Sequence, residues 1–128
     1  MVGRSGCRLR RTLTLTIFLA AAPYAGEQAS TAMRLATAAI NAGHRVNIFA
    51  SADGVYGFTV GHRAKGLPSA ETGFGDLIAQ GVHVELCGSC LATRGIRREN
   101  LLPNAGPSSL ERLFRLIRES DVLLTLGG

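Results

Sequence analysis

Residues 13–19, LTLTIFL, decide how the rest of the chain is interpreted. This short apolar run contains β-branched residues and ends shortly before Pro23, as a buried strand of a parallel sheet does. Together with the basic residues before it, the run also resembles a secretory signal. We favour the strand, because a helix pattern follows and the run is shorter than the ~20 residues of a membrane span. The strand interpretation predicts a cytoplasmic protein with reduced cysteines and no membrane contact.

The segments that follow alternate between helix and strand patterns. Small and apolar residues recur at helical spacing over residues 29–40, and Gly43 is typical of the position after a helix. Residues 45–50, RVNIFA, indicate a second strand, and the alternation over residues 82–86 indicates a half-buried third strand. Three weaker assignments fill the interval: a short helix near Val55–Val60, a loop up to Thr72, and the end of a helix at Gly75–Gln80.

The last helix is the most clearly marked. Ser108, with Glu111 three residues later, predicts a capping box at its start. Its apolar residues fall at i, i+3, i+4 and i+7, on one stripe: Leu110, Leu113, Phe114 and Ile117. We expect the basic residues of the opposite face to be solvated: Arg112, Arg115 and Arg118. Residues 122–126, VLLTL, predict a further buried strand.

This alternation predicts an α/β fold. We expect a small doubly wound, mostly parallel sheet of about four to five strands with helices on both faces. A single domain over residues 12–128 would follow a basic tail of residues 1–11. Ligands and chemistry gather at the carboxyl ends of the strands in such sheets. Three loops are predicted to lie there: Pro23–Gln28, Ser51–Val55 and Cys87–Gly95.

The net charge of +5 belongs mostly to the first residues of the chain. The 128 residues contain 14 basic and 9 acidic side chains. Four of the basic ones, Arg4, Arg8, Arg10 and Arg11, lie in the tail, so the remainder carries 10 basic against 9 acidic. Aromatic residues make up only 5% and tryptophan is absent. A nucleic-acid surface needs clustered cations and often aromatic stacking, so we expect no nucleic-acid binding by the domain.

Two cysteines directly follow the predicted third strand, in the sequence Cys87-Gly88-Ser89-Cys90. Three basic residues come next in the chain: Arg94, Arg97 and Arg98. Guanidinium groups near a thiol lower its pKa and favour the nucleophilic thiolate. A free cysteine is often only a small buried apolar residue. We favour the reactive interpretation for Cys87, leave both open for Cys90, and assign no role to Cys7 in the tail.

The sequence predicts no metal site and no cofactor. A structural zinc site needs four ligands, and the chain has one CxxC pair. A lone strand histidine such as His83 is more often a surface or packing residue. No GxGxxG follows the first strand and no phosphate-binding loop with Gly-Lys-Ser/Thr is present. A thioredoxin-type redox pair stays open, although that motif usually follows an early strand.

The order and spacing of these segments resemble the DsrE/TusD-like (DsrE/F-like) sulfur-relay family, in its stand-alone, homomeric type. The resemblance runs from about Leu13 to Leu126 and is carried by Pro23-Tyr24-Ala25-Gly26, Ala42-Gly43-His44-Arg45-Val46, Asp53-Gly54-Val55-Tyr56, Gly81-Val82, Leu86-Cys87-Gly88-Ser89-Cys90 and Arg94-Gly95. It implies a small doubly wound fold, assembly as homotrimers or homohexamers, and in some members a persulfide on the cysteine that matches Cys87. The Arg-rich residues 1–11 depart from this pattern.

The leading functional hypothesis is a sulfur carrier or sulfurtransferase-like protein. Cys87 would take sulfur from a donor protein as a persulfide and relay it to an acceptor protein. Arg94 or backbone N–H groups would favour the anionic forms, and Cys90 could act as a resolving thiol. Whether the chain is an enzyme stays open.

Two alternatives come from other functional classes. The first is a non-catalytic homo-oligomeric assembly or small-ligand-binding module, with a pocket lined by Tyr24, Asp53 and Tyr56. The second is a dithiol redox protein that cycles Cys87 and Cys90 between dithiol and disulfide.

Overall fold

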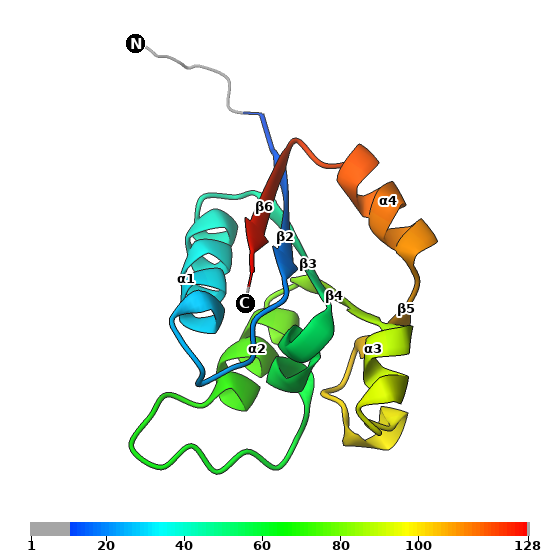
Figure 1. Cartoon of the computed structure of the whole chain (residues 1–128). Helices are drawn as coiled ribbons and strands as arrows, with labels where there is room; N and C mark the ends of the chain where they lie inside the picture. The colour runs from blue at the N-terminus through cyan, green and yellow to red at the C-terminus, as the bar shows by residue number, and fades with distance from the viewer. Residues whose placement is uncertain (1–10, 128) are drawn as a thin grey trace.

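The computed structural model describes residues 11–127, which form a five-stranded sheet with helices on both faces (Figure 1). The predictions made for Cys7 and for the arginines at positions 4, 8 and 10 lie outside the described residues. In chain order the elements are β2 (Thr14–Leu19), α1 (Gln28–Asn41), β3 (Arg45–Ala50), the 3-10 helix η1 (Ala52–Phe58), α2 (Ala70–Ala79), β4 (His83–Cys87), α3 (Gly88–Thr93), the 3-10 helix η2 (Arg98–Asn100), β5 (Ala105–Ser108), α4 (Leu110–Arg118) and β6 (Val122–Leu126). The strand order is β5-β4-β3-β2-β6, and every pair is parallel. The predicted fold class is confirmed.

The pairing of β2 with β3 forms the inner part of the sheet. The register runs from Thr14 opposite Arg45 to Leu19 opposite Ala50, without a bulge. On its other side β2 pairs with β6, so residues 14–19 form an interior strand. Side chains alternate between the two faces of a strand. Because helices cover both faces of the sheet, an interior strand has mostly apolar residues on both of its faces. The strand interpretation of these residues is confirmed.

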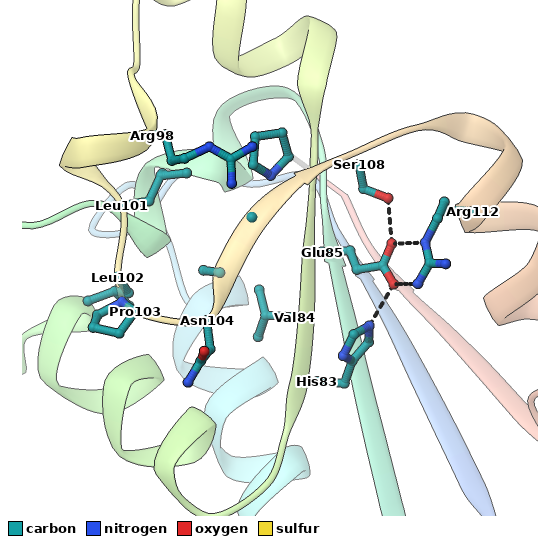
Figure 2. A pocket seen from close by; sticks show the side chains of 13 residues that line it. His83, Val84, Glu85, Arg98, Leu101, Leu102, Pro103, Asn104, Ser108 and Arg112 are labelled. Atoms are coloured by element: carbon teal, nitrogen blue, oxygen red, sulfur yellow. Dashed lines mark hydrogen bonds and ion pairs between the residues drawn. The ribbon is translucent and has the colours of Figure 1, made fainter.

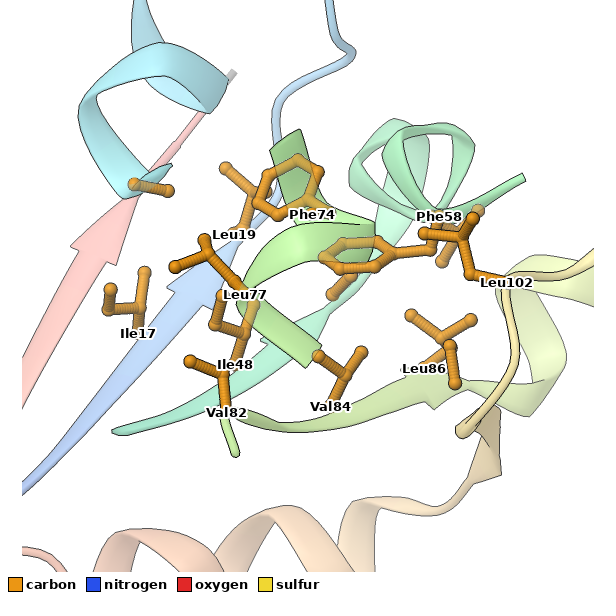
Figure 3. Packing of buried hydrophobic residues seen from close by; sticks show 14 of the residues in the cluster. Ile17, Leu19, Ile48, Phe58, Phe74, Leu77, Val82, Val84, Leu86 and Leu102 are labelled. Atoms are coloured by element: carbon orange, nitrogen blue, oxygen red, sulfur yellow. The ribbon is translucent and has the colours of Figure 1, made fainter. Parts of the chain in front are cut away.

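The larger core lies between the sheet and helices α1 and α2. Ala29, Ala32 and Ala36 are the buried residues of α1, and their small size lets the helix approach the sheet closely. Phe58 of η1 and Phe74 of α2 stack at 4.3 Å between ring centroids. Figure 3 shows these rings packed together with the aliphatic side chains of the inner strands: Ile17, Leu19, Ile48, Val84 and Leu86. Burial of this apolar surface is the main favourable contribution to folding.

The opposite face of the sheet is covered by α4. Phe49 packs there against Leu113 and Leu116, and its ring stacks on Phe18 at 6.1 Å between centroids. In Figure 1 this helix lies on the other side of the sheet from α1. The sheet is therefore enclosed from both sides, as the doubly wound prediction required.

The capping box predicted at Ser108 is wrong. The cap of α4 is Ser109, whose hydroxyl accepts the N–H of Arg112 at 3.3 Å. Ser108 instead ends β5, the edge strand that pairs with β4. The sequence of β5, AGPS, has low strand propensity. Only the tertiary pairing with β4 makes this segment a strand, and the sequence gives little sign of it.

Three further features differ from the expectations: the starts of two helices and the burial of one strand. The helix α2 begins at Ala70, with Ser69 accepting the N–H of Thr72, so the loop before it is shorter than predicted. The short helix η1 starts at Ala52, three residues before its predicted start. The last strand β6 is not buried: it forms a sheet edge, and Val122, Leu123 and Leu124 are exposed.

An ion pair between a buried carboxylate and an exposed arginine fastens α4 to the sheet. Glu85 of β4 is 5% exposed, and Arg112 donates to its carboxylate twice, at 3.0 and 2.7 Å. His83 lies 2.6 Å from the same carboxylate, and the Ser108 hydroxyl also donates to it (Figure 2). The hydrogen bond from Arg112 is the largest cause that lowers the pKa of Glu85 from 4.5 to about 2, against the opposing effect of burial. Arg112 is exposed, as the sequence predicted, but its guanidinium also reaches back to the sheet, which the sequence did not predict.

Gly54 marks the closest approach of η1 to the sheet. Its N–H donates to the carbonyl of Ser51 at 2.9 Å, and a Cβ at this position would lie 2.3 Å from the carbonyl oxygen of Leu19. That oxygen belongs to the backbone of an interior strand, so it cannot move aside cheaply. Only glycine fits here.

The substitution Glu85→Gln should lower the free energy of unfolding by about 2 kcal/mol at neutral pH, because it removes the charged acceptor of the hydrogen bonds from Arg112. The folded-state pKa of Glu85 is lowered from 4.5 to about 2, so the carboxylate stabilises the fold above pH 4.5 and loses its effect as the pH falls to about 2. Urea unfolding at pH 6.5 and pH 3 should show a smaller loss on acidification in Glu85→Gln than in the wild type. Glu111→Gln, an exposed change on the same helix, is the control. Parallel pH dependences of Glu85→Gln and wild type would contradict this account.

Gly54→Ala should destabilise the fold by about 2 kcal/mol or more, because its methyl group collides with the Leu19 carbonyl. Thermal or urea unfolding measures the change. The control is Gly75→Ala in α2, where a Cβ meets nothing within 4 Å and the helix gains from losing a glycine. Equal stability of Gly54→Ala and wild type would show that η1 does not need this close approach.

Candidate functional site

The two cysteines of the described residues, Cys87 and Cys90, lie at the edge of the sheet where the parallel strands end. Cys87 is the last residue of β4, and Cys90 lies in α3, which starts directly after it. The neighbouring strand β3 ends at Ala50, and the N–H of Ser51 donates to the carbonyl of Leu19 at 2.9 Å. The loops after β3 and β4 therefore meet at this edge, as the topology predicts.

The loop after β3 supplies hydrogen bonds to Cys90. The backbone N–H of Ala52 donates to Cys90 Sγ at 3.1 Å, and the Ser51 hydroxyl lies 3.5 Å from the same sulfur. Ser51, Ala52 and Cys90 are all half-buried, so these contacts are partly shielded from water. A low local dielectric strengthens such interactions with a charged sulfur.

The backbone of Ala52 is in the left-handed region, with φ of 50°. A non-glycine residue there costs roughly 1–2 kcal/mol. This conformation belongs to the turn that directs the Ala52 N–H at Cys90. Gly54, two residues later, fixes the start of η1 against β2. The strained turn is thus held in place by the packing described above.

The surroundings of Cys90 favour its thiolate. Burial by itself raises the pKa of the Cys90 thiol, but hydrogen bonds from Ser51, Cys87 and the Ala52 N–H lower it, as does the charge of Arg94. The combined effect is a pKa of Cys90 below its ordinary value. The donors that contact the Cys90 sulfur, the Ala52 N–H and the Ser51 hydroxyl, therefore favour the thiolate form of Cys90.

Arg94 lies beside Cys90, as part of an ion pair that joins α3 to η1. Its Nε donates to Asp53 Oδ1 at 2.9 Å, and its Nη1 donates to the carbonyl of Cys90 at 3.2 Å. The hydrogen bond with Asp53 raises the pKa of Arg94, so the guanidinium stays charged. Arg97 and Arg98 are exposed, and Arg98 lines a separate cavity of about 550 Å³ next to Glu85 (Figure 2). Of the three arginines predicted near the thiols, Arg94 alone contacts Cys90 in the described structure.

Cys87 faces the α4 side of the sheet. It is half-buried and packs against the cluster of Phe49, Leu113 and Leu116. Cys90 is packed against the larger core on the other side. The two side chains thus pack against different faces of the sheet, at the point where β4 ends.

The three residues predicted to line one ligand pocket do not lie around a single cavity. Tyr24 lines a cavity of about 440 Å³ beside Met33 and Leu67, and its hydroxyl lies 2.7 Å from His62 Nδ1. Asp53 lines a different cavity of about 420 Å³. Tyr56, like Asp53, is exposed and lies near Arg94. The structure therefore brings Asp53 and Tyr56 towards the cysteines and places Tyr24 elsewhere.

Ser51 and Ala52 were not predicted from the sequence as partners of a cysteine. Their only signal was their position at the carboxyl end of a predicted strand. Within residues 11–127, no group of three His, Cys, Asp or Glu side chains is arranged to hold a metal ion. Over the same residues, no helix combines the length and apolar character needed to cross a membrane.

Comparison with known proteins gives consistent matches along almost the whole chain. The uncharacterized protein MJ0989 of Methanocaldococcus jannaschii is 31% identical over 113 residues, which cover 88% of this chain and 99% of that protein. The uncharacterized protein MK0008 of Methanopyrus kandleri is 32% identical over 107 residues, which cover 84% and 88% respectively.

Solved structures agree with these sequence matches. The crystal structure of the ychN protein from E. coli superimposes with a TM-score of 0.84 at 26% identity, and the match covers 89% of this chain and 99% of that one. The structure of MTH1491 from Methanobacterium thermoautotrophicum shares the fold, with a TM-score of 0.64 at 18% identity over 88% and 98% of the two chains. The model of the DsrE/DsrF-like family matches residues 14–126, from the first residue of β2 to the last of β6. With the strand order and the cysteine edge described above, these matches show that the chain belongs to the DsrE/DsrF-like family.

Proposed function

We propose that the protein is a sulfur carrier that takes up sulfur as a persulfide on Cys87 and relays it to a partner protein. The observation that carries this proposal is the position of Cys87 and Cys90 at the carboxyl edge of the sheet, where the Ala52 N–H and the Ser51 hydroxyl contact the Cys90 sulfur. A thiolate is the form of cysteine that attacks sulfur. Membership of the DsrE/DsrF-like family, which implies a sulfur-relay type of role, supports the same proposal.

Sulfur transfer in this scheme takes two displacement steps. The Cys87 thiolate attacks the outer sulfur of a donor persulfide, R–S–SH, the donor S–S bond breaks, and R–S⁻ leaves. Cys87 then carries S–SH. A thiolate on the acceptor attacks the outer sulfur, and the Cys87 thiolate leaves. No external oxidant or reductant is needed, and the charge of Arg94 and the Ala52 N–H stabilise the negative charge near the reacting atoms.

The presence of two free cysteines three residues apart also favours a second candidate function. Cys87 ends β4 and Cys90 lies in the first turns of α3, so a dithiol–disulfide cycle would use these two residues. That cycle requires a two-electron oxidant, and it requires both cysteines. The carrier requires a persulfide donor and one cysteine that holds the sulfur.

Incubation of the protein with a small-molecule persulfide donor should add one sulfur atom, which a reductant removes. Intact mass followed by peptide mass spectrometry should place the sulfur on Cys87. Cys87→Ser should lose the adduct, Cys90→Ser should keep it at long incubation times, and Ser89→Ala, an exposed change between the two, should behave as wild type. A full adduct on Cys87→Ser, or none on the wild type with several donors, would refute the assignment. Loss of the sulfur adduct in both cysteine variants, together with a disulfide in the oxidised wild type, favours the redox function.

We further propose that the chain assembles as a homo-oligomer, a homotrimer or homohexamer by its family resemblance. Two sets of exposed apolar side chains support this assembly. The edge strand β6 exposes Val122, Leu123 and Leu124, and the outer side of α4 exposes Leu110 and Phe114 at 62% and 65%. Free strand edges and large exposed apolar side chains are typical of surfaces that pair with another chain.

Leu123→Lys and Phe114→Lys should each reduce the molar mass in solution towards that of the 13.5 kDa monomer, because a charge at these positions opposes burial between subunits. Size-exclusion chromatography with light scattering measures the mass, and circular dichroism checks the fold. The matched control is Leu67→Lys, because Leu67 is 55% exposed but lies in the loop before α2. A monomeric wild type, or an unchanged mass in both variants, would exclude assembly through these surfaces.

A further inference from the structure

We propose that the cavity beside β5 is a binding site for a small organic anion, a carboxylate or phosphate ester with an apolar body. The cavity has a volume of about 550 Å³ and is lined by residues of β4, η2, β5 and α4 (Figure 2). Pockets that bind small molecules commonly enclose ~300–1,000 Å³. Neither Cys87 nor Cys90 lines this cavity, so the site is separate from the proposed sulfur-carrier function.

The carboxylate of Glu85, which lines the cavity, has no position left for a ligand cation. A carboxylate offers about four lone-pair sites, and an ionised one can only accept hydrogen bonds. Arg112 donates to Glu85 twice, at 3.0 and 2.7 Å, and Ser108 and His83 Nε2 supply one donor each. With its charge balanced by Arg112 and its acceptor sites occupied, Glu85 neither attracts a cation nor strongly repels an anion.

Arg98 supplies the positive charge that is left over at the cavity. None of the ion pairs among residues 11–127 involves this side chain, which is exposed on η2. A guanidinium binds carboxylates and phosphates through its planar set of N–H groups. Asn104, in the turn before β5, also lines the cavity, and its amide adds a neutral N–H donor. The charge available to a ligand is therefore positive, which favours an anion.

His83 is held at this cavity with one ring nitrogen uncommitted. Its Nε2 lies 2.6 Å from Glu85 Oε2, and no residue in the part of the chain that the structure describes forms a hydrogen bond with its Nδ1. Figure 2 shows the ring beside Glu85, with the second nitrogen directed away from the carboxylate. The side chain is 51% exposed, so a molecule that enters the cavity can reach it. The ring is therefore a spectroscopic reporter of binding.

The remaining lining of the cavity is largely apolar. It includes side chains of the sheet and of the segment before β5 that are themselves buried: Val84, Leu101, Leu102 and Ala105. Apolar surface of a ligand that packs against them adds affinity roughly in proportion to the area removed from water. An anion that carries an apolar body therefore fits this cavity better than an inorganic ion does.

A peptide strand fits this place less well, although β5 is an edge of the sheet. The strand has only four residues, AGPS. Its Pro107 has no backbone N–H, and short edge strands that contain proline resist the addition of another strand. The occupant is therefore a small molecule that uses side chains for recognition.

The test is an NMR titration of the isotope-labelled full chain with benzoate and with phenyl phosphate at constant pH. The chain has 3 histidines, so the ring signals of His83 can be assigned with the variant His83→Gln. At least one of the two anions should shift these signals saturably, while His44 and His62, which do not line the cavity, stay unchanged. Arg98→Gln should weaken binding about threefold, as the loss of an exposed charge pair does. Arg97→Gln, an exposed neighbour outside the cavity, should bind as wild type.

Two comparison probes separate the contributions of charge and of the apolar body. Benzylamine has an apolar body with a positive charge and should leave the His83 signals in place, whereas inorganic phosphate should bind more weakly than phenyl phosphate. Tighter binding of benzoate assigns the site to carboxylates, and tighter binding of phenyl phosphate assigns it to phosphate esters. The proposal is overturned by an absence of saturable shifts with both anions, by equal shifts with benzylamine, by inorganic phosphate binding as tightly as phenyl phosphate, or by equal affinities of Arg98→Gln and Arg97→Gln. Circular dichroism of each variant checks the fold.

Discussion

The parallel pairing of β2 with β3 is the contact on which the rest of the structure depends. It sets Leu19 beside Ala50, so both strands end together and their loops leave from one edge. The chain after β3 then passes back over the carbonyl of Leu19, at a distance that only Gly54 permits. This return orients the Ala52 N–H towards Cys90. A backbone contact in the middle of the sheet thereby determines the hydrogen bonding of a thiol in another loop.

The strand β4 carries a structural charge cluster and the thiol of Cys87 on the same face. Glu85 and Cys87 are two residues apart and both face α4, because side chains alternate along a strand. Glu85 is neutralised by Arg112 and ties α4 to the sheet. That tie also holds Leu113 and Leu116 against Cys87. The Glu85–Arg112 ion pair thus takes no part in the chemistry proposed for the thiols, but it keeps Leu113 and Leu116 packed against Cys87.

Much of the fold was predictable, and the main errors lie where tertiary contacts rather than local patterns decide the structure. The strands LTLTIFL and RVNIFA and the helix that ends before Gly43 have strong local patterns, and the structure confirms them. The strand β5, with the sequence AGPS, has no such pattern and is a strand only because β4 offers a free edge. Because β5 was not predicted, Ser108 was expected to cap α4, whereas the cap is Ser109. The strand β6 was predicted from its apolar sequence, but its exposure follows from its place at the end of the sheet.

The α/β class follows from the sequence alone, and so does the position of Cys87 and Cys90 at the carboxyl edge of the sheet. Local periodicity and the rule for parallel sheets suffice for this, since both depend on residues close together in the chain. Which groups surround each thiol depends on tertiary contacts. The donors to Cys90 come from Ser51 and Ala52, 39 and 38 residues away, and one of them is a backbone N–H that any residue except proline would provide. A contact made by the backbone leaves no mark in residue type, so it became visible only when the loops after β3 and β4 were brought together.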